Sequence, residues 1–333
     1  MHRRLVELLL CQILLIGNVA GCATTKPPPE SVAPRSRFTA LAIDADGNIV
    51  SASSTASGAF LEKWSPDGRL LYTADLETHH FCTVTAIVID QEFIYCALSH
   101  DQRPSLPIRV EISRFSLVDG GFAPFTGHSE SILKGRVQPY PQLQVPLLRS
   151  PIRGMDVAGS TLYVADAFDG RIRMIDTSTG LSKGEFSVHL PHGVAVDPIG
   201  QIWVASNHDT ITACRADGYS GVTYGGFGEI TSMAFGPGAT LYVSDSLAGQ
   251  VMMLDGNANP PKFVPFLGSK AKAVDGEGDH FFNLLAVVVD GKGNLVTLDG
   301  GGDSGTSRLV KWSPEKKLLW ERVPSTARST GRN

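Results

Sequence analysis

One thirteen-residue pattern recurs along this chain and restricts the folds that it can adopt. Each copy has a short apolar stretch, a turn rich in Asp, Gly or Pro, and a second apolar stretch, which together predict a β-hairpin. The copies are LAIDADGNIVSAS from Leu41, IVIDQEFIYCALS from Ile87, MDVAGSTLYVADA from Met155, VAVDPIGQIWVAS from Val194, MAFGPGATLYVSD from Met233 and VVVDGKGNLVTLD from Val287. A second, more polar hairpin follows most of them, as in GRIRMIDTSTG.

The spacing of the copies predicts a β-propeller. Successive copies start 46, 68, 39, 39 and 54 residues apart, and four short antiparallel strands repeated at about this period are typical of a propeller blade. We therefore expect an all-β protein with one six-bladed β-propeller at 38–324 and a tail at 325–333. The expected blades lie at about 38–80, 81–127, 151–188, 189–227, 228–267 and 281–324.

Two segments exceed this repeat and are expected to form long loops. They are HSESILKGRVQPYPQLQVPLLRS, His128–Ser150, and GSKAKAVDGEGDH, Gly268–His280. Long loops often carry function. For the first of them a contribution to a seventh blade is the alternative.

A ten-residue phrase occurs near both ends of the domain, as KWSPDGRLLY from Lys63 and KWSPEKKLLW from Lys311. Each copy is predicted to be the third strand, turn and fourth strand of a terminal blade. Because the first and last blades are neighbours in a ring, the two phrases should lie side by side at its closure. Trp64 and Trp312 are expected to pack within the outer blades. SPEK lacks the Gly of SPDG, which predicts a strained turn or another turn type.

The N-terminus predicts export. MHRRLVELLLCQILLIGNVAGC has a basic start and an apolar stretch too short to span a bilayer, as in a signal peptide. VAGC resembles the bacterial lipobox, which implies cleavage after residue 21 and lipid attachment to Cys22. The expected organisation is a lipoprotein signal peptide at 1–21 and a Pro-rich tether at 22–37. The protein would then be anchored to the cell envelope, at the outer membrane if the cell has one.

Three cysteines remain for the folded domain: Cys82, Cys96 and Cys214. The predicted hairpin places Cys96 opposite about Ala86, roughly 13 Å from Cys82. That separation is too large for a disulfide, so buried thiols are expected.

Several stretches resemble NHL repeats, a family of propeller motifs. The resemblance rests on RGMDVAGSTLYVADAFDGRIRMIDTSTG, HGVAVDPIGQIWVASN and the Gly-rich DGEGDHFFNLLAVVVDGKGNLVTLD. It implies a six-bladed propeller and leaves the function open, because the fold carries enzymes, scaffolds and binders.

In a propeller, the start of each first strand and the end of each second strand face one mouth of the ring. Aligning the six copies places Thr39, Thr85, Arg153, His192, Thr231 and Leu285 at equivalent positions near that mouth. The predicted ligand-binding residues are Arg153, Asp166, His192, Asn207, His208, Glu229, Asp245, Asn283 and Asp299. Asp101, Asp169, Asp209, Asp303 and His280 are expected nearby. Such a mouth suits a polar ligand; no cofactor is predicted, although a central Ca²⁺ or other divalent ion fits the carboxylates.

PHGVAVDPIGQIWVASN resembles the His-Gly repeats of peptidyl-α-hydroxyglycine α-amidating lyases, which hold a metal with His from several blades. Here only His192 occupies that position, and catalytic zinc usually has three protein ligands. A ligand set like that of gluconolactonase-like propellers, from Glu229, Asn207 and Asp245 or from Asn283 and Asp299, is the other enzymatic alternative.

Other polar groups are assigned structural roles. Asp44, Asp90, Asp197 and Asp290 are expected to form first turns, His79 and His80 to lie in a solvated connection, and Asp299–Gly305 to be a flexible loop rather than a calcium site. The net charge of −4 without a basic run argues against nucleic-acid binding. The favoured function is a binding platform for a protein, peptide or glycan; a metal-dependent lyase or lactonase is the alternative.

Overall fold

The computed structural model divides the chain into two compact units, Met1–Ala33 and Pro34–Asn333. It describes residues 37–55, 58–76, 82–100, 108–127, 132–137, 152–270, 280–300 and 307–324, all in the second unit. The signal peptide, Cys22 and the tether lie outside the described residues. Within those residues, no helix has the length and apolar character that a membrane span requires.

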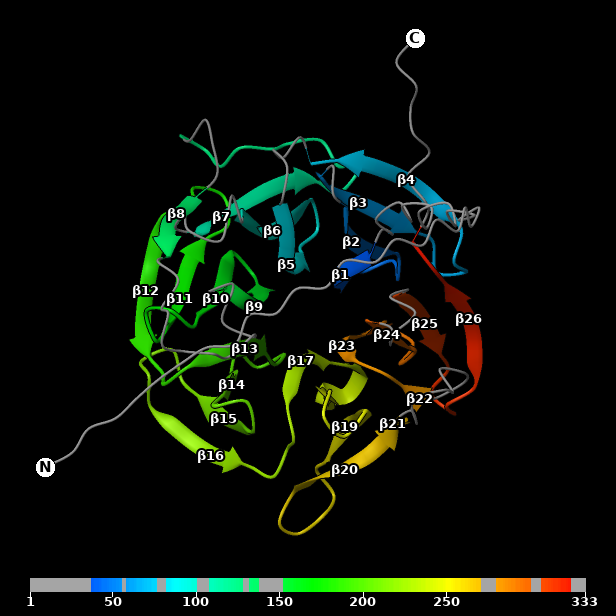
Figure 1. The fold of residues 1–333 in the computed structure, drawn as a ribbon. Coiled ribbons are helices and arrows are strands. Elements are labelled where there is room, and N and C mark those ends of the chain that lie inside the picture. Colours follow the sequence, from blue (N-terminus) through cyan, green and yellow to red (C-terminus); the bar gives the residue numbers. More distant parts are fainter. Residues whose placement is uncertain are drawn as a thin grey trace, which may run out of the picture. The chain divides into compact units, whose positions relative to one another are not determined.

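The second unit is a ring of six four-stranded antiparallel sheets, so the predicted six-bladed propeller is confirmed (Figure 1). Blade 1 consists of β1 (Arg37–Ile43), β2 (Ile49–Thr55), β3 (Gly58–Trp64) and β4 (Leu70–Asp75). Blade 2 consists of β5 (Cys82–Ile89), β6 (Phe93–His100), β7 (Ile108–Ser116) and β8 (Ile132–Val137). Blade 3 consists of β9 (Ile152–Ala158), β10 (Thr161–Asp166), β11 (Arg171–Asp176) and β12 (Ser182–Ser187).

The other half of the ring repeats this arrangement. Blade 4 consists of β13 (Pro191–Val196), β14 (Ile202–Ser206), β15 (Thr210–Cys214) and β16 (Ser220–Tyr224). Blade 5 consists of β17 (Ile230–Phe235), β18 (Leu241–Asp245), β19 (Gln250–Asp255) and β20 (Lys262–Leu267), with the short 3-10 helix η2 (Pro237–Ala239) between its first strands. Blade 6 consists of β23 (Leu284–Val289), β24 (Leu295–Asp299), β25 (Arg308–Trp312) and β26 (Leu318–Arg322). β21 (Ser269–Lys270) and β22 (His280–Phe281) form a small parallel pair before it.

Six apolar clusters hold the ring together, one between each pair of neighbouring blades in the described residues. The cluster at the closure joins Phe38 and Trp64 of blade 1 to Val296 and Leu309 of blade 6. A single blade exposes two apolar faces, and radial stacking buries both without a long free sheet edge. The ring thus has a core divided into six interfaces rather than one central core.

Both terminal blades own four strands, so side chains close the ring, without exchange of a strand. The duplicated phrase supplies many of these contacts. Lys311 Nζ lies 3.0 Å from Asp290 in its own blade and donates to the Pro66 carbonyl of blade 1 at 3.2 Å. Arg322 Nε donates to the Gly68 carbonyl at 2.7 Å. The two phrases therefore meet at the closure, as predicted.

The same phrase makes equivalent contacts in blade 1. Lys63 Nζ lies 3.3 Å from Asp44 and donates to the Leu117 carbonyl of blade 2. Trp64 and Trp312 are buried, and each indole donates to a hydroxyl of the second strand of its blade. Their predicted packing role is confirmed.

The SPEK turn keeps the geometry of SPDG. The amide of Gly68 donates to Ser65 O at 2.8 Å, and the amide of Lys316 donates to Ser313 O at 2.9 Å. The φ angles are +80° at Gly68 and +65° at Lys316. A side chain occupies a left-handed conformation in the second turn, which is strained. Of the two predicted possibilities, the strained turn is the one found.

Blade 2 differs from the predicted boundaries, because its fourth strand is β8 within the expected loop rather than a strand before residue 127. The segment after β7 makes a single bridge, Phe115 with Phe122. Pro124 lacks an amide proton, and the carbonyls of Ala123 and Pro124 accept hydrogen bonds from Arg114 instead. β8 pairs with β7 in their place, so these residues complete blade 2 rather than a seventh blade.

Cys82, Cys96 and Cys214 are buried free thiols, as predicted. Cys96 lies opposite Ile87 rather than Ala86, because the turn between β5 and β6 pairs Ile89 with Ile94 and so sets the register one residue away from the predicted one. The first-turn aspartates also act as predicted. Asp44, Asp90, Asp197 and Asp290 each accept hydrogen bonds from two backbone amides within the following four residues.

Candidate functional site

A β-bulge interrupts the pairing of the first and second strands in all six blades. In each bulge one residue of the first strand has no partner on the second, which bends the strand and re-aims that side chain. The six bulged residues are Thr39, Thr85, Arg153, His192, Thr231 and Leu285. These are the six positions that sequence alignment of the repeat placed at the mouth.

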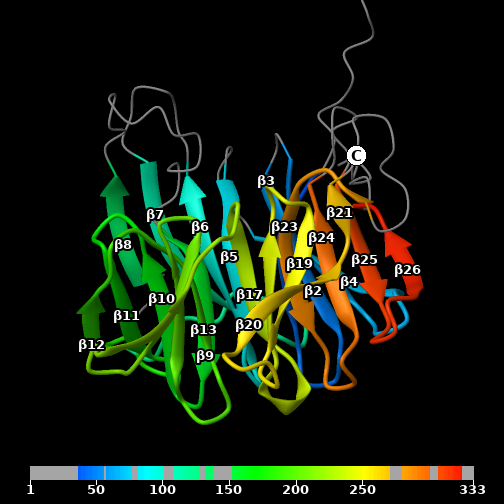
Figure 2. The same cartoon turned by 90° about the horizontal axis from the view of Figure 1, so that it is seen from below.

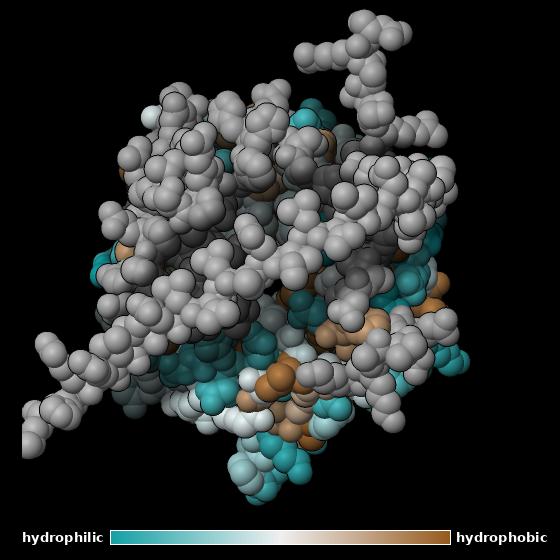
Figure 3. Space-filling view, viewed as in Figure 1, coloured by the Kyte–Doolittle hydropathy of each residue, from teal (hydrophilic) through white to brown (hydrophobic). Residues whose placement is uncertain are grey.

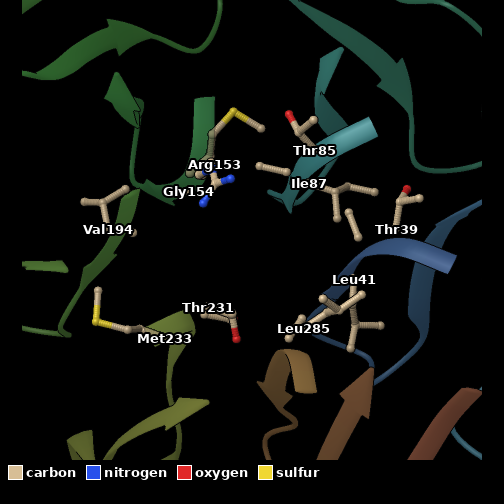
Figure 4. A pocket seen from close by; sticks show the side chains of 16 residues that line it. Thr39, Leu41, Thr85, Ile87, Arg153, Gly154, Val194, Thr231, Met233 and Leu285 are labelled. Carbon is tan, nitrogen blue, oxygen red and sulfur yellow. The ribbon is translucent and has the colours of Figure 1, made fainter. Parts of the chain in front are cut away.

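Five of the bulged residues line a cavity of about 80 Å³ at the centre of the ring; His192 is the exception (Figure 4). At the level of the bulges the lining is mostly polar, with Thr39, Thr85, Arg153 and Thr231, and Leu285 completes it. Two residues further along the first strands, the lining is apolar, with Leu41, Ile87, Met155, Val194 and Met233. In the side view of Figure 2 the first strands run along the axis of the ring. The space-filling view of Figure 3 shows hydrophilic and hydrophobic residues side by side on the described part of one face of the ring. The cavity thus has a polar entrance and an apolar floor.

Two of the three threonines of this ring connect neighbouring blades, whereas Thr39 donates to Ala52 O within blade 1. Thr85 Oγ1 donates to Ile152 O of blade 3 at 2.8 Å, and Thr231 Oγ1 donates to Leu284 O of blade 6 at 2.7 Å. Each hydroxyl proton is therefore committed to the first strand of the next blade. These two threonines therefore stabilise the ring, and a charged ligand must be bound by other residues.

Arg153 brings a positive charge into the central cavity. Figure 4 shows its guanidinium nitrogens at the edge of the space between the first strands. Burial lowers the pKa of Arg153, and the negative charge of Glu229 acts in the opposite direction. No hydrogen bond or ion pair joins this guanidinium to another residue in the part of the chain that the structure describes.

His192 is buried beside this cavity, with 5% of its surface exposed. Its Nδ1 lies 3.4 Å from Leu190 O, whereas Nε2 has no hydrogen-bond partner among the described residues. Burial, together with charge repulsion from His208 and Arg153, lowers the pKa of His192 to about 4. The ring is therefore neutral at pH 7. With the proton on Nδ1, Nε2 carries a free lone pair.

His208 stacks on His192, with ring centroids 5.2 Å apart and an angle of 23° between the planes. The turn that carries it has two left-handed residues, Asn207 at φ +52° and His208 at φ +70°. Such strain in non-glycine residues often accompanies functional sites. The amide of Asn207 donates to Leu190 O, which fixes the turn against the strand that carries His192.

The predicted carboxylates are mostly engaged in structural contacts. Asp245 is buried and accepts hydrogen bonds from the amides of Gly228, Glu229 and Ala248. Asp299 is fully buried, accepts from the amides of the loop before β23 and pairs with Arg308 at 3.2 Å. Both hold the incoming loop of their blade. Asp166 pairs with Arg173 at 2.8 Å, and Asp169 pairs with the same arginine.

The remaining predicted residues divide between the mouth and its rim. Glu229 is half-buried and near enough to Arg153 to affect its pKa. Asn207 and Asn283 are exposed, and Asn283 Oδ1 accepts a hydrogen bond from Ser246. Among the nearby candidates, Asp209 is exposed, and His280 Nδ1 lies 3.1 Å from Ser269 Oγ. His79, His80, Asp101 and Asp303 lie outside the described residues.

Four of the nine predicted site residues therefore come together: Arg153, His192, His208 and Glu229. They are contributed by three consecutive blades and their connections. We call them the mouth cluster. The described residues contain no group of three or more His, Cys, Asp or Glu side chains arranged to hold a metal ion.

A row of three polar side chains in blade 2 was not predicted. Cys82 and His100 are cross-strand partners, and His100 Nε2 lies 3.3 Å from Glu111 Oε1. The hydrogen bonds to Cys82 and then to Glu111 raise the pKa of His100 to about 9, against the effect of burial. All three residues are buried. Sequence offered little signal, because the three lie on different strands and depend on the register.

A larger cavity of about 340 Å³ lies between blades 2 and 3, lined by Asp90, Phe93, Tyr95, Arg114 and Thr177 among others. Its polar groups already have partners. Arg114 donates to three backbone carbonyls and lies over the rings of Phe93 and Phe125. Tyr95 donates to Asp90 at 2.6 Å. These groups join the two blades, and the mouth cluster remains the better candidate site.

No protein-family model matches the chain, and no curated protein matches it. Solved structures do resemble it. Virginiamycin B lyase from Staphylococcus aureus is 12% identical with a TM-score of 0.51, over 88% of this chain and 86% of that one. A Thermus thermophilus protein named as an oxidoreductase (glucose dehydrogenase) is 16% identical with a TM-score of 0.54, over 84% and 98%.

A nidogen/laminin complex contains a further similar chain, at 14% identity and a TM-score of 0.52, over 88% of this chain and 94% of that one. The three structures are a lyase, a protein named as an oxidoreductase and a nidogen/laminin complex. At identities of 12–16% the similarity shows the propeller fold alone. Function must therefore be argued from the residues of this site.

Proposed function

We propose that this protein is an envelope-anchored lipoprotein whose NHL-like propeller binds a protein, peptide or glycan at its mouth. The observation that carries the proposal is the mouth cluster. Arg153 and His192 are the two ionisable residues of the bulged ring, and each keeps hydrogen-bonding capacity that no described residue uses. A buried polar group without a partner destabilises a fold, so its presence calls for an explanation, and a bound ligand is one that fits both residues.

The mouth cluster also has both charges and an aromatic surface. Arg153 and Glu229 supply opposite charges, and the imidazole of His208, which stacks on the buried ring of His192, supplies a flat aromatic face. A few convergent polar groups beside an apolar surface are typical of ligand sites. A peptide or sugar ring can satisfy these groups together.

The anchoring half of the proposal rests on the sequence. Residues 1–22 have the basic start, short apolar stretch and final VAGC that resemble a lipoprotein signal, and the Pro-rich segment up to residue 37 suits a tether. Metabolic labelling with an alkynyl palmitate analogue should mark the wild-type chain and not Cys22→Ala. Cys11→Ala, in the segment expected to be cleaved, should label normally. Equal labelling of wild type and Cys22→Ala would reject the anchor.

Binding at the mouth is tested by a double substitution with a matched control. Arg153→Ala with His192→Ala removes both ionisable residues of the bulged ring. Arg215→Ala with His189→Ala removes an exposed arginine and an exposed histidine elsewhere. Envelope peptides and glycans would be arrayed and bound to each protein. Loss of binding in the first variant alone supports the site, and retention of every interaction in a folded first variant rejects it.

A metal-dependent lyase or lactonase is the second candidate function. The free Nε2 of His192 favours it, because a neutral imidazole with an unshared lone pair is a good metal ligand. The described residues do not supply the further ligands as a group. Elemental analysis of protein purified without chelator separates the candidates. About one equivalent of calcium, zinc or iron would favour the enzyme, and its loss in His192→Ala would place the ion at the mouth.

A further inference from the structure

We propose that the central cavity binds a carboxylate group of the ligand, held by the guanidinium of Arg153. This inference rests on the proposed function of the mouth and specifies the chemistry of its ligand. It follows from the position of Arg153 in the bulged ring, from the absence of an ion pair or hydrogen bond between its guanidinium and any described residue, and from the size of the cavity.

The first argument concerns the charge. Burying a guanidinium without a partner destabilises the folded state, because a charge loses favourable contacts with water. Arg153 is half-buried, and burial lowers its pKa while the charge of Glu229 acts in the opposite direction; no described residue forms an ion pair or hydrogen bond with the guanidinium. Other arginines of the same blade are fully paired: Arg173 contacts Asp166, Asp169 and Glu185. The guanidinium of Arg153 is therefore available to bind a negatively charged group of a ligand.

The second argument concerns geometry. A β-bulge places Arg153 at the polar level of the cavity, between Thr85 of blade 2 and the start of blade 4. The planar guanidinium presents parallel N–H groups, which match the two oxygens of a carboxylate. The hydroxyls of Thr85 and Thr231 already donate to carbonyl oxygens of neighbouring blades, so they cannot also donate to an anion. Recognition of the negative group thus depends on Arg153.

The third argument concerns size and charge number. A cavity of about 80 Å³ has room for a carboxylate and a few waters. A single guanidinium balances one negative charge, which favours a carboxylate over a doubly charged phosphate ester. Leu41, Ile87 and Met233 make the lining apolar two residues further along the first strands, which disfavours a charged group at that level. The remainder of the ligand would extend outward past His192, His208 and Glu229.

The probes are sodium acetate and sodium succinate, with sodium chloride and sodium phosphate for comparison at equal ionic strength. The protein is the full-length chain in detergent micelles at pH 7. Because a ligand that binds only the folded state raises its stability, saturating acetate or succinate should raise the thermal midpoint by about 2–4 °C. Chloride and phosphate should give smaller shifts.

Three variants localise the effect. Arg153→Gln should abolish the shift, and without carboxylate it should unfold no earlier than wild type, because an unpaired charge has been removed. Arg153→Lys should retain a reduced shift, since an ammonium group cannot form the paired N–H contacts. Arg215→Gln, at an exposed arginine in blade 4, should behave as wild type.

The outcomes separate this inference from the proposed function. An equal carboxylate shift in Arg153→Gln would overturn the carboxylate site. So would a wild-type thermal midpoint that rises no more in acetate or succinate than in chloride. If Arg153→Gln lost the shift and also lost binding on the arrays, both proposals would be supported. If the carboxylate shift were absent while His192→Ala still abolished array binding, the platform would stand and the carboxylate would be rejected.

Discussion

The ammonium group of Lys311 lies 3.2 Å from the carbonyl oxygen of Pro66, a residue 245 positions earlier in the chain. This contact is where the first and last blades meet. The same ammonium group is 3.0 Å from the Asp290 carboxylate, and both side chains are almost fully buried. In blade 1, Lys63 makes the equivalent contacts to Asp44 and to blade 2. The lysine of each copy of the duplicated phrase thus joins its terminal blade to the neighbouring blade.

Replacing Lys311 by Met should destabilise the protein strongly. The substitution leaves the Asp290 carboxylate buried without its cation and removes a contact across the closure. Breaking a buried ion pair in this way typically costs 3–5 kcal/mol. Urea unfolding should show a loss of about 3 kcal/mol for Lys311→Met and less than about 0.5 kcal/mol for the exposed Lys292→Met. Similar losses in both variants would argue against a role of this lysine in closure.

Gly68→Ala should destabilise the protein more than a comparable change in an open turn. At φ +80° an added Cβ would lie 3.0 Å from Arg322 Nη2 and 3.1 Å from Trp320 Cδ2. Gly200 has φ +86° and nothing within 4 Å of such a Cβ. We expect losses of about 2–3 kcal/mol for Gly68→Ala and about 1 kcal/mol for Gly200→Ala, measured by urea unfolding. Equal losses would mean that the closure adapts to the extra methyl group.

His192 should make the fold less stable in mild acid. Burial lowers the pKa of its folded form to about 4, below the ordinary value for histidine of about 6.5. Between these values the unfolded chain binds a proton that the folded protein excludes, so stability is lost as the pH falls from about 6.5 to 4. The loss should reach about 3 kcal/mol.

The measurement is the difference in unfolding free energy between wild type and His192→Phe from pH 4 to pH 8. A difference that changes with pH only below about 6.5 supports the prediction. His189→Phe, at an exposed histidine, is the control and should show no such dependence. A flat difference for His192→Phe would show that its folded pKa is not lowered.

His100 should act in the opposite direction. Its contacts with Cys82 and Glu111 raise the pKa of the folded form to about 9. Above pH 6.5 the unfolded chain releases a proton that the folded protein keeps. The contribution of His100 is therefore fully present below pH 6.5 and is lost as the pH rises through about 9.

Cys82→Ala and Cys96→Ala form a matched pair for this prediction, since both remove a buried thiol from blade 2. Cys82→Ala should remove most of the alkaline loss of stability, because it removes the largest cause of the raised pKa. Cys96→Ala should leave that loss in place. The readout is the unfolding free energy between pH 6 and pH 9.5; identical profiles for the two variants would contradict the Cys82–His100 contact.

Local patterns in the sequence predicted much of the fold. First-turn aspartates such as Asp44 and Asp290 bond the amides that follow them, and these bonds depend only on neighbouring residues. The repeated hairpins gave the number of blades, and alignment of the copies placed Arg153 and His192 at equivalent positions. The fourth strand of blade 2 was missed, because Pro124 removes a local donor and a more distant segment pairs with β7.

What tertiary structure decided is which polar groups remain unsatisfied. From the sequence, Asp245, Asp299, Arg153 and His192 were all predicted ligand-binding residues. In the ring, backbone amides and Arg308 satisfy the two aspartates, whereas the guanidinium of Arg153 and Nε2 of His192 have no hydrogen-bond partner among the described residues. Periodicity and turn chemistry are encoded within a few residues and can be found in sequence. The partners of a buried charge come from other blades, and only the closed ring determines them.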